Sequence, residues 1–293
     1  MITVFMYNRV MLKKIIISFF LVSLVQLSFF KVIDKASSEQ LDRAFTRSVT
    51  VFAIARSLNG LVSVLQGTEI YATPAGVGMN FAVGQIVDPM NDMIERFSWI
   101  MLMSSVSLGI QEILLHFGQT SIVQNFLALS VLILLFVLWV PKLWHKESFK
   151  LMFQAFVIIS FLRFFVPFIV LLNESVYTYA LEEQYEKAKM SLEVTQTQTE
   201  IIVHKVRQNQ KLHNESWLDS FNLSQQVENF KLKMENLWKS LKNKFEHAVE
   251  YMLSLIAIFL VQSVFLPLGF LWLSIKIFRV IMHIDITRVI EKN

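Results

Sequence analysis

LMFQAFVIISFLRFFVPFIVLL, residues 151–172, carries a single charged side chain, that of Arg163, in an otherwise largely apolar run. A helix needs about 20 such residues to cross the hydrocarbon core of a bilayer. Apolar runs of similar length occupy 122–140 and 249–275. These three stretches therefore predict membrane-spanning helices.

The composition of the whole chain agrees with that prediction. Hydrophobic residues make up 54% of the 293 positions and charged residues 17%, against roughly 25% charged in a soluble domain. The net charge of +4 does not indicate a nucleic-acid partner, because Lys and Arg are scattered and gather beside the apolar runs. Basic residues at such positions set membrane orientation. The expected partner is the lipid bilayer.

Two further stretches leave alternatives open. Residues 15–33 follow Arg9, Lys13 and Lys14 and fit either a signal peptide or an anchor, but no convincing small-residue cleavage site follows, which favours an uncleaved anchor. Residues 97–115 are long enough to span but include several serines, Gln111 and Glu112. That segment could cross the membrane, re-enter it or lie in a bundle.

The distribution of positive charge favours one topology. Cytoplasmic loops carry the excess of Lys and Arg. If 97–115 does not cross, every basic cluster beside a span lies on the cytoplasmic side, whereas a full crossing would push the loop 141–150, with its three lysines, outside. We therefore predict about four spans, both termini in the cytoplasm, and a bacterial inner-membrane location.

The first external region, 34–96, is predicted to hold a helix and a small β-hairpin. Ser37 or Ser38 can cap an amphipathic helix that runs to about Gln66. Two β-prone runs then flank the Pro/Gly-rich turn 74–78, and such a hairpin needs a pairing partner, for example in a neighbouring subunit. Asp88 and Pro89 suit the start of a helix that stops at Gly118.

The second external region, 174–248, predicts a long antiparallel helical hairpin that resembles a coiled coil. The chain reverses near Asn214. The first helix has a weak seam with two polar interruptions, Thr195 and Thr199, among Tyr185, Ala188, Leu192, Ile202 and Val206. The returning helix carries a stronger seam with alternating spacings of four and three, which suits packing against a partner protein or another subunit. That seam consists of Leu223, Val227, Phe230, Met234, Leu237 and Leu241.

The fold class expected is thus an all-α integral membrane protein with these two external additions. The predicted organisation, in chain order, is a cytoplasmic N-terminus and first anchor (1–33), the first external region (34–96), a helix of mixed polar and apolar residues that is re-entrant or membrane-embedded (97–118), two spans joined by a basic loop (119–173), the helical hairpin (174–248), and a last span with a cytoplasmic tail (249–293).

Catalytic and metal-binding signatures are missing from the sequence. It has no nucleophile-elbow, zinc-protease or phosphate-loop motif, and its histidines are not spaced as ligand pairs. The absence of cysteine excludes disulfides and thiolate metal sites. We expect no enzymatic activity, no cofactor, and no catalytic or metal-ligating residue.

Arg163 is the leading candidate for a functional residue, because a charge inside the membrane is expensive and needs a partner. Gln111 and Glu112 are the expected partners. Arg163 paired with one of them could either hold helices together or line a pore. Asp88, Asp92 and Glu95 could form a cation-binding rim, although acidic residues at a helix start explain them equally well.

Two functions remain open. In one, the protein is a homo-oligomeric pore or channel-like assembly with an external helical collar. In the other, it is a membrane-anchored scaffold or signalling component whose hairpin docks a partner protein. A membrane enzyme is a distant third.

Overall fold

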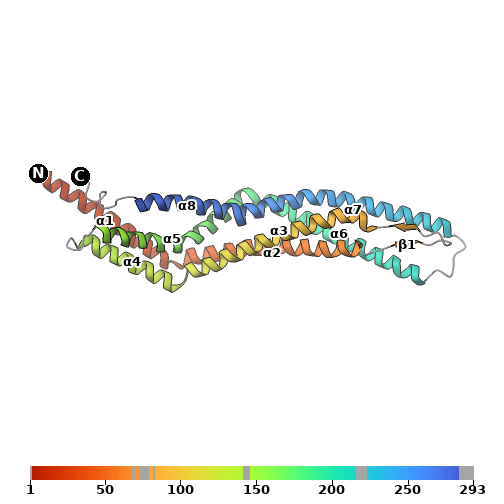
Figure 1. Ribbon diagram of the computed structural model, residues 1–293, viewed down its shortest axis with the longest axis horizontal. Helices are drawn as coiled ribbons and strands as arrows, with labels where there is room; N and C mark the ends of the chain where they lie inside the picture. Colours follow the sequence, from red (N-terminus) through yellow and green to blue (C-terminus); the bar gives the residue numbers. More distant parts are fainter. Residues whose placement is uncertain are drawn as a thin grey trace. The chain divides into compact units, whose positions relative to one another are not determined.

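A computed structural model describes residues 2–66, 70–72, 79–81, 83–140, 146–215 and 223–283, and within these residues the chain is nearly all helical (Figure 1). The helices are α1 (Ile2–Phe29), α2 (Lys31–Gln66), α3 (Val83–Gly118), α4 (Ser121–Trp139), α5 (Lys146–Val176), α6 (Glu182–Glu215), α7 (Leu223–Leu260) and α8 (Leu266–His283). Two π-helical turns, η2 (Tyr177–Leu181) and η3 (Val261–Phe265), continue α5 into α6 and α7 into α8.

Six helical segments of the described residues are long and apolar enough to cross a membrane, judged by length and composition. They confirm the coarse prediction of a helical protein with several potential membrane spans. Besides the predicted spans they include Lys31–Gln66 and Asp88–Gly118, so the number of crossings is not settled at four. The six are Met11–Phe29, Lys31–Gln66, Asp88–Gly118, Ser121–Trp139, Phe149–Gln208 and Lys242–Ile281.

Two predicted helix starts are wrong. Helix α2 begins at Lys31, and the hydroxyl of Ser37 donates back to the carbonyl of Ile33 (2.8 Å) instead of capping a helix. A serine inside a helix commonly bonds to the preceding turn in this way. Helix α3 begins at Val83, so Pro89 lies inside it, and Asp88 accepts a hydrogen bond from Gln66 Nε2 (2.7 Å).

Two three-residue strands, β1 (Ile70–Ala72) and β2 (Met79–Phe81), pair antiparallel, with Tyr71 opposite Asn80. The predicted turn, 74–78, falls outside the described residues. A two-stranded ribbon is at best marginally stable alone. These short strands do not establish the predicted hairpin as a folded unit, and its pairing with a neighbouring subunit stays a prediction.

The chain divides into two compact units. Unit 1 comprises Met1–Phe45, Ser107–Val176 and Gln262–Asn293, and unit 2 comprises Thr46–Val106 and Tyr177–Val261. Helices α2 and α3 each contribute one part to each unit. Each unit has its own buried apolar residues.

Unit 1 has two apolar clusters. In the first, α1, α4 and α5 meet around buried residues such as Leu21, Leu127 and Phe156. In the second, the start of α2, the end of α3, α5 and α8 meet around Leu41 and Leu115. Aromatic stacking extends the second cluster, because the Phe270 ring lies 5.5 Å from Phe165 and 5.0 Å from Phe168, centroid to centroid.

Unit 2 has one continuous core built from α2, α3, α6 and α7. Its centre includes the fully buried side chains of Leu58, Val62, Leu192 and Leu255. Helices α6 and α7 lie side by side (Figure 1), and the chain reverses between them. The weak seam predicted on α6 faces this core, where its members are buried: Tyr185, Ala188, Leu192, Thr195, Thr199, Ile202 and Val206.

An aromatic cluster lies beside η2 in unit 2. The rings of Tyr177 and Tyr185 meet edge to face at 5.8 Å, and Tyr185 meets Phe259 in the same way at 6.0 Å. The guanidinium carbon of Arg47 lies 3.6 Å from the Tyr177 ring centroid, a cation–π contact. Burial raises the pKa of Tyr185 above the usual value for tyrosine, so its hydroxyl stays neutral.

Candidate functional site: a buried arginine and a buried amide cluster

Arg163, on α5 in unit 1, is almost completely buried, with 1% of its surface exposed. Its Nη2 donates to both carboxylate oxygens of Asp34, at 2.7 and 2.8 Å. The same Nη2 donates to the backbone carbonyl of Ser28 (2.7 Å), and Nε donates to the Ser28 hydroxyl (3.0 Å). The buried charge is therefore paired within the chain.

The break between α1 and α2 explains why the guanidinium of Arg163 binds at this place. Helix α1 ends at Phe29 and α2 begins at Lys31, so the Ser28 carbonyl lies in the last turn of α1. Carbonyl groups in a last turn receive no hydrogen bond from the backbone of their own helix. Asp34 lies in the first turn of α2, where the helix dipole favours an acidic residue. The guanidinium thus meets the negative end of one helix and a carboxylate at the start of the next.

The C-terminal end of α3 packs against the same region. A Cβ at Gly118 would lie 3.0 Å from the carbonyl oxygen of Leu162 and 3.7 Å from that of Arg163. Gln119 Nε2 donates to the Asp34 carbonyl (3.3 Å) and to the Ser38 hydroxyl (3.4 Å). Glycine is needed at the end of α3 because the backbone of α5 approaches so closely.

The expected partners of Arg163 were wrong. Glu112 lies 3.9 Å from His116 one turn along α3, and Gln111 donates to the backbone carbonyl of Ser263 (3.4 Å). Asp34 takes the place predicted for them. A sequence signal exists, since Asp34 directly follows the first apolar run, but the predicted topology places Asp34 in the external region.

A second polar group in unit 1 surrounds the π-helical turn η3. Asn173 Nδ2 donates to the Gln262 carbonyl (2.8 Å), and the Ser107 hydroxyl donates to the Ser263 carbonyl (2.7 Å). Gln111, Asn173, Gln262 and Ser263 are all at least nine-tenths buried. Single-turn π-bulges are frequent at functional sites. We refer to Ser107, Gln111, Asn173, Gln262 and Ser263 as the amide cluster.

The predicted acidic rim does not form a metal site. Asp88, Asp92 and Glu95 are exposed on α3. Among the described residues, no three His, Asp or Glu side chains are grouped closely enough to hold a metal ion. The rim as a looser cation-attracting surface stays a prediction.

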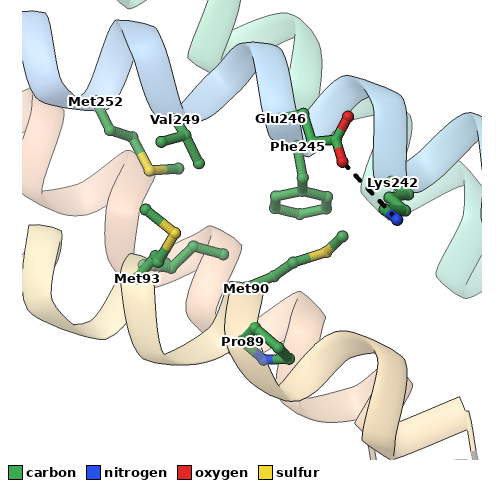
Figure 2. A pocket seen from close by; sticks show the side chains of 9 residues that line it. Pro89, Met90, Met93, Lys242, Phe245, Glu246, Val249 and Met252 are labelled. Atoms are coloured by element: carbon green, nitrogen blue, oxygen red, sulfur yellow. Dashed lines mark ion pairs between the residues drawn. The ribbon is translucent and has the colours of Figure 1, made fainter.

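The predicted seam Leu223, Val227, Phe230, Met234, Leu237 and Leu241 lies on α7, but its side chains fall outside the described residues. Further along α7, unit 2 has an apolar groove of about 320 Å³. Figure 2 shows Met90 and Met93 of α3 opposite Phe245 and Met252 of α7. Lys242 and Glu246 pair at its edge, 3.9 Å apart.

No protein-family model matches this chain, and neither a curated protein nor a solved structure is detectably similar to it. Its function therefore has to be inferred from its own residues and their geometry.

Proposed function

We propose that the protein is a membrane-anchored scaffold whose α6–α7 hairpin docks a helix of a partner protein outside the membrane. The observation that carries the proposal is the unbroken helical segment from Lys146 through η2 to Glu215. Its first part contains the predicted span 151–172, and its last part packs on α7. Such a segment joins the predicted anchor to the α6–α7 hairpin through a continuous run of helical residues.

The outer face of α6 offers a surface for such a partner. Met190, Val194 and Ile201 are exposed, and with Thr197 they follow spacings of four, three and four along one stripe. Residues at these spacings lie on the same face of a helix. The Lys189–Glu193 pair (3.9 Å) borders the stripe, as charged residues border coiled-coil seams. A partner helix with its own apolar seam fits this face.

Four spans and a cytoplasmic location of both termini remain part of this proposal, because they keep the basic loop 141–150 inside. The alternative, a homo-oligomeric pore, is based on Arg163, on the polar helix 97–115 and on the incomplete seams of the helical hairpin. With its charge engaged by Asp34 and Ser28 of the same chain, Arg163 no longer favours a conduit. The scaffold is therefore the better supported proposal.

The test combines mass measurement with site-specific crosslinking in cells. A photoreactive residue at Val194 is expected to capture one discrete partner protein, whereas the same residue at Gln184, exposed on another face of α6, is not. Purification in a mild detergent is expected to give a monomer or a complex with that partner. A closed ring of identical chains, with crosslinks only between copies, would contradict the scaffold and favour the pore.

A further inference from the structure

The amide cluster contains three buried oxygen atoms that have no hydrogen-bond donor among the described residues. They are Gln111 Oε1, Asn173 Oδ1 and Gln262 Oε1. The exposed fractions of these residues are 8%, 6% and 1%. A buried acceptor without a partner is unfavourable and rare. Three such acceptors in one cluster indicate a ligand that binds to oxygen lone pairs.

Exchanging the amide nitrogen and oxygen of Gln111 or Asn173 would not give every polar atom a hydrogen-bond partner. Gln111 and Asn173 each point the NH₂ group at a backbone carbonyl, that of Ser263 or of Gln262. After a flip, two oxygens would face each other and a hydrogen bond would be lost. The carbonyl acceptors therefore decide the orientation of these two amides, and their free oxygens are a consequence of the fold.

The three oxygens belong to one place in unit 1. Gln262 is a residue of η3, and Gln111 and Asn173 are bonded to the backbone of η3 from α3 and α5. The Ser107 hydroxyl, which donates to the Ser263 carbonyl, keeps its own lone pairs. Sequence-distant segments thus bring neutral polar groups to the same helical turn, and none of the five residues of the amide cluster is charged.

We infer that the amide cluster binds a small monovalent metal cation. Hard cations take oxygen ligands, and divalent ions in proteins are usually held by carboxylates, which the cluster lacks. In membrane proteins, carbonyl groups at irregular helical turns coordinate such monovalent ions. One water molecule offers only two protons for three acceptors, whereas a metal cation is not limited in this way and commonly takes several oxygen ligands. This site is separate from the docking surface proposed on α6.

The first test uses the intact wild-type protein in detergent. Thermal unfolding is measured in chloride salts of lithium, sodium, potassium and choline at equal ionic strength. At least one alkali cation is expected to raise the Tm above that in choline by about 2–4 °C, and the shift should saturate with concentration. Equal Tm values in all four salts would overturn the inference.

The second test removes one oxygen. Gln262→Met keeps the length of the side chain and should abolish the cation-dependent shift, whereas Gln124→Met on α4, outside the cluster, should retain it. If no cation binds, Gln262→Met merely removes an unsatisfied acceptor and should not lower the Tm. A variant at least as stable as wild type in the selected salt would therefore contradict the site.

A direct binding measurement does not depend on any variant. Equilibrium dialysis of the wild-type protein against radioactive sodium, or against rubidium as a substitute for potassium, is expected to show about one ion bound per chain in a saturable manner. Binding that does not saturate, or none above the detergent blank, would overturn the inference.

Discussion

Units 1 and 2 use buried polar groups in different ways. In unit 2, the buried hydroxyls of Ser105, Thr195 and Thr199 donate to carbonyls one turn earlier in their own helices, at 2.7 to 2.9 Å. In unit 1, Arg163 reaches Ser28 and Asp34, and the amides of the amide cluster reach η3 from other helices. These buried hydroxyls bond within one helix in unit 2, where bonds between helices come from less buried side chains such as Gln196, which donates to Ser57 (2.9 Å). In unit 1 the buried arginine and amides connect helices.

This difference predicts which kind of change each unit tolerates. A hydroxyl bonded within its own helix does not select a neighbouring helix, so apolar packing decides the arrangement of unit 2. Side chains that bridge helices leave an unpaired buried group when one partner is lost. Unit 1 should therefore be most sensitive to polar substitutions and unit 2 to loss of apolar volume.

The largest effect is expected in unit 1 for Asp34→Ala, which leaves Arg163 buried without its counter-charge. The expected loss is about 3–5 kcal/mol of unfolding free energy, measured by reversible unfolding in detergent. Lys35→Ala is the control, because its pair with Glu39 (3.7 Å) is exposed and contributes less than about 1 kcal/mol. Equal losses for both variants would contradict the bridging role of Asp34.

In unit 2, the comparison predicts a large effect for an apolar truncation. Leu255→Ala removes a fully buried side chain and should cost about 2–5 kcal/mol. Leu253, two residues away on α7, is 57% exposed, so Leu253→Ala should change stability by about 0.5 kcal/mol or less. The same unfolding assay distinguishes the two, and a similar cost for both would place the core of unit 2 elsewhere.

A smaller effect is expected where α3 meets α5 in unit 1. Gly118→Ala places a methyl group 3.0 Å from the Leu162 carbonyl and should cost about 1–3 kcal/mol. Gly60→Ala on α2 meets nothing within 4 Å and should stabilise its helix by about 0.5–1 kcal/mol. Opposite signs in the Tm shifts would confirm the close approach, and a neutral Gly118→Ala would exclude it.

The smallest effect is expected for the local hydroxyls of unit 2. Thr199→Val removes one hydrogen bond, from the threonine hydroxyl to the Thr195 carbonyl (2.7 Å). That carbonyl still belongs to the helical backbone, so the variant should change stability by about 1 kcal/mol or less. Thr197→Val, on the exposed side of α6, removes an equivalent bond to Glu193 (3.0 Å). If Thr199→Val cost as much as Asp34→Ala, the distinction between the units would fail.

The sequence by itself determined the helical class, because runs such as 151–172 are too long and apolar for any other structure in a membrane. It also identified Arg163 as a residue that needs a partner, and it placed Tyr185, Leu192 and Thr199 on one face of a helix. These inferences depend on composition and on the 3.6-residue period, both of which are local properties.

Only the tertiary structure decided which groups meet. Arg163 and Asp34 are far apart in the chain, and periodicity along one helix does not say which other helix faces it. Likewise, the π-helical turn at 261–265 and the approach of Asn173 to it arise from packing between helices, not from a local motif. Pairing of buried polar groups depends on tertiary packing, because the positions of the other helices determine which groups come within hydrogen-bond distance.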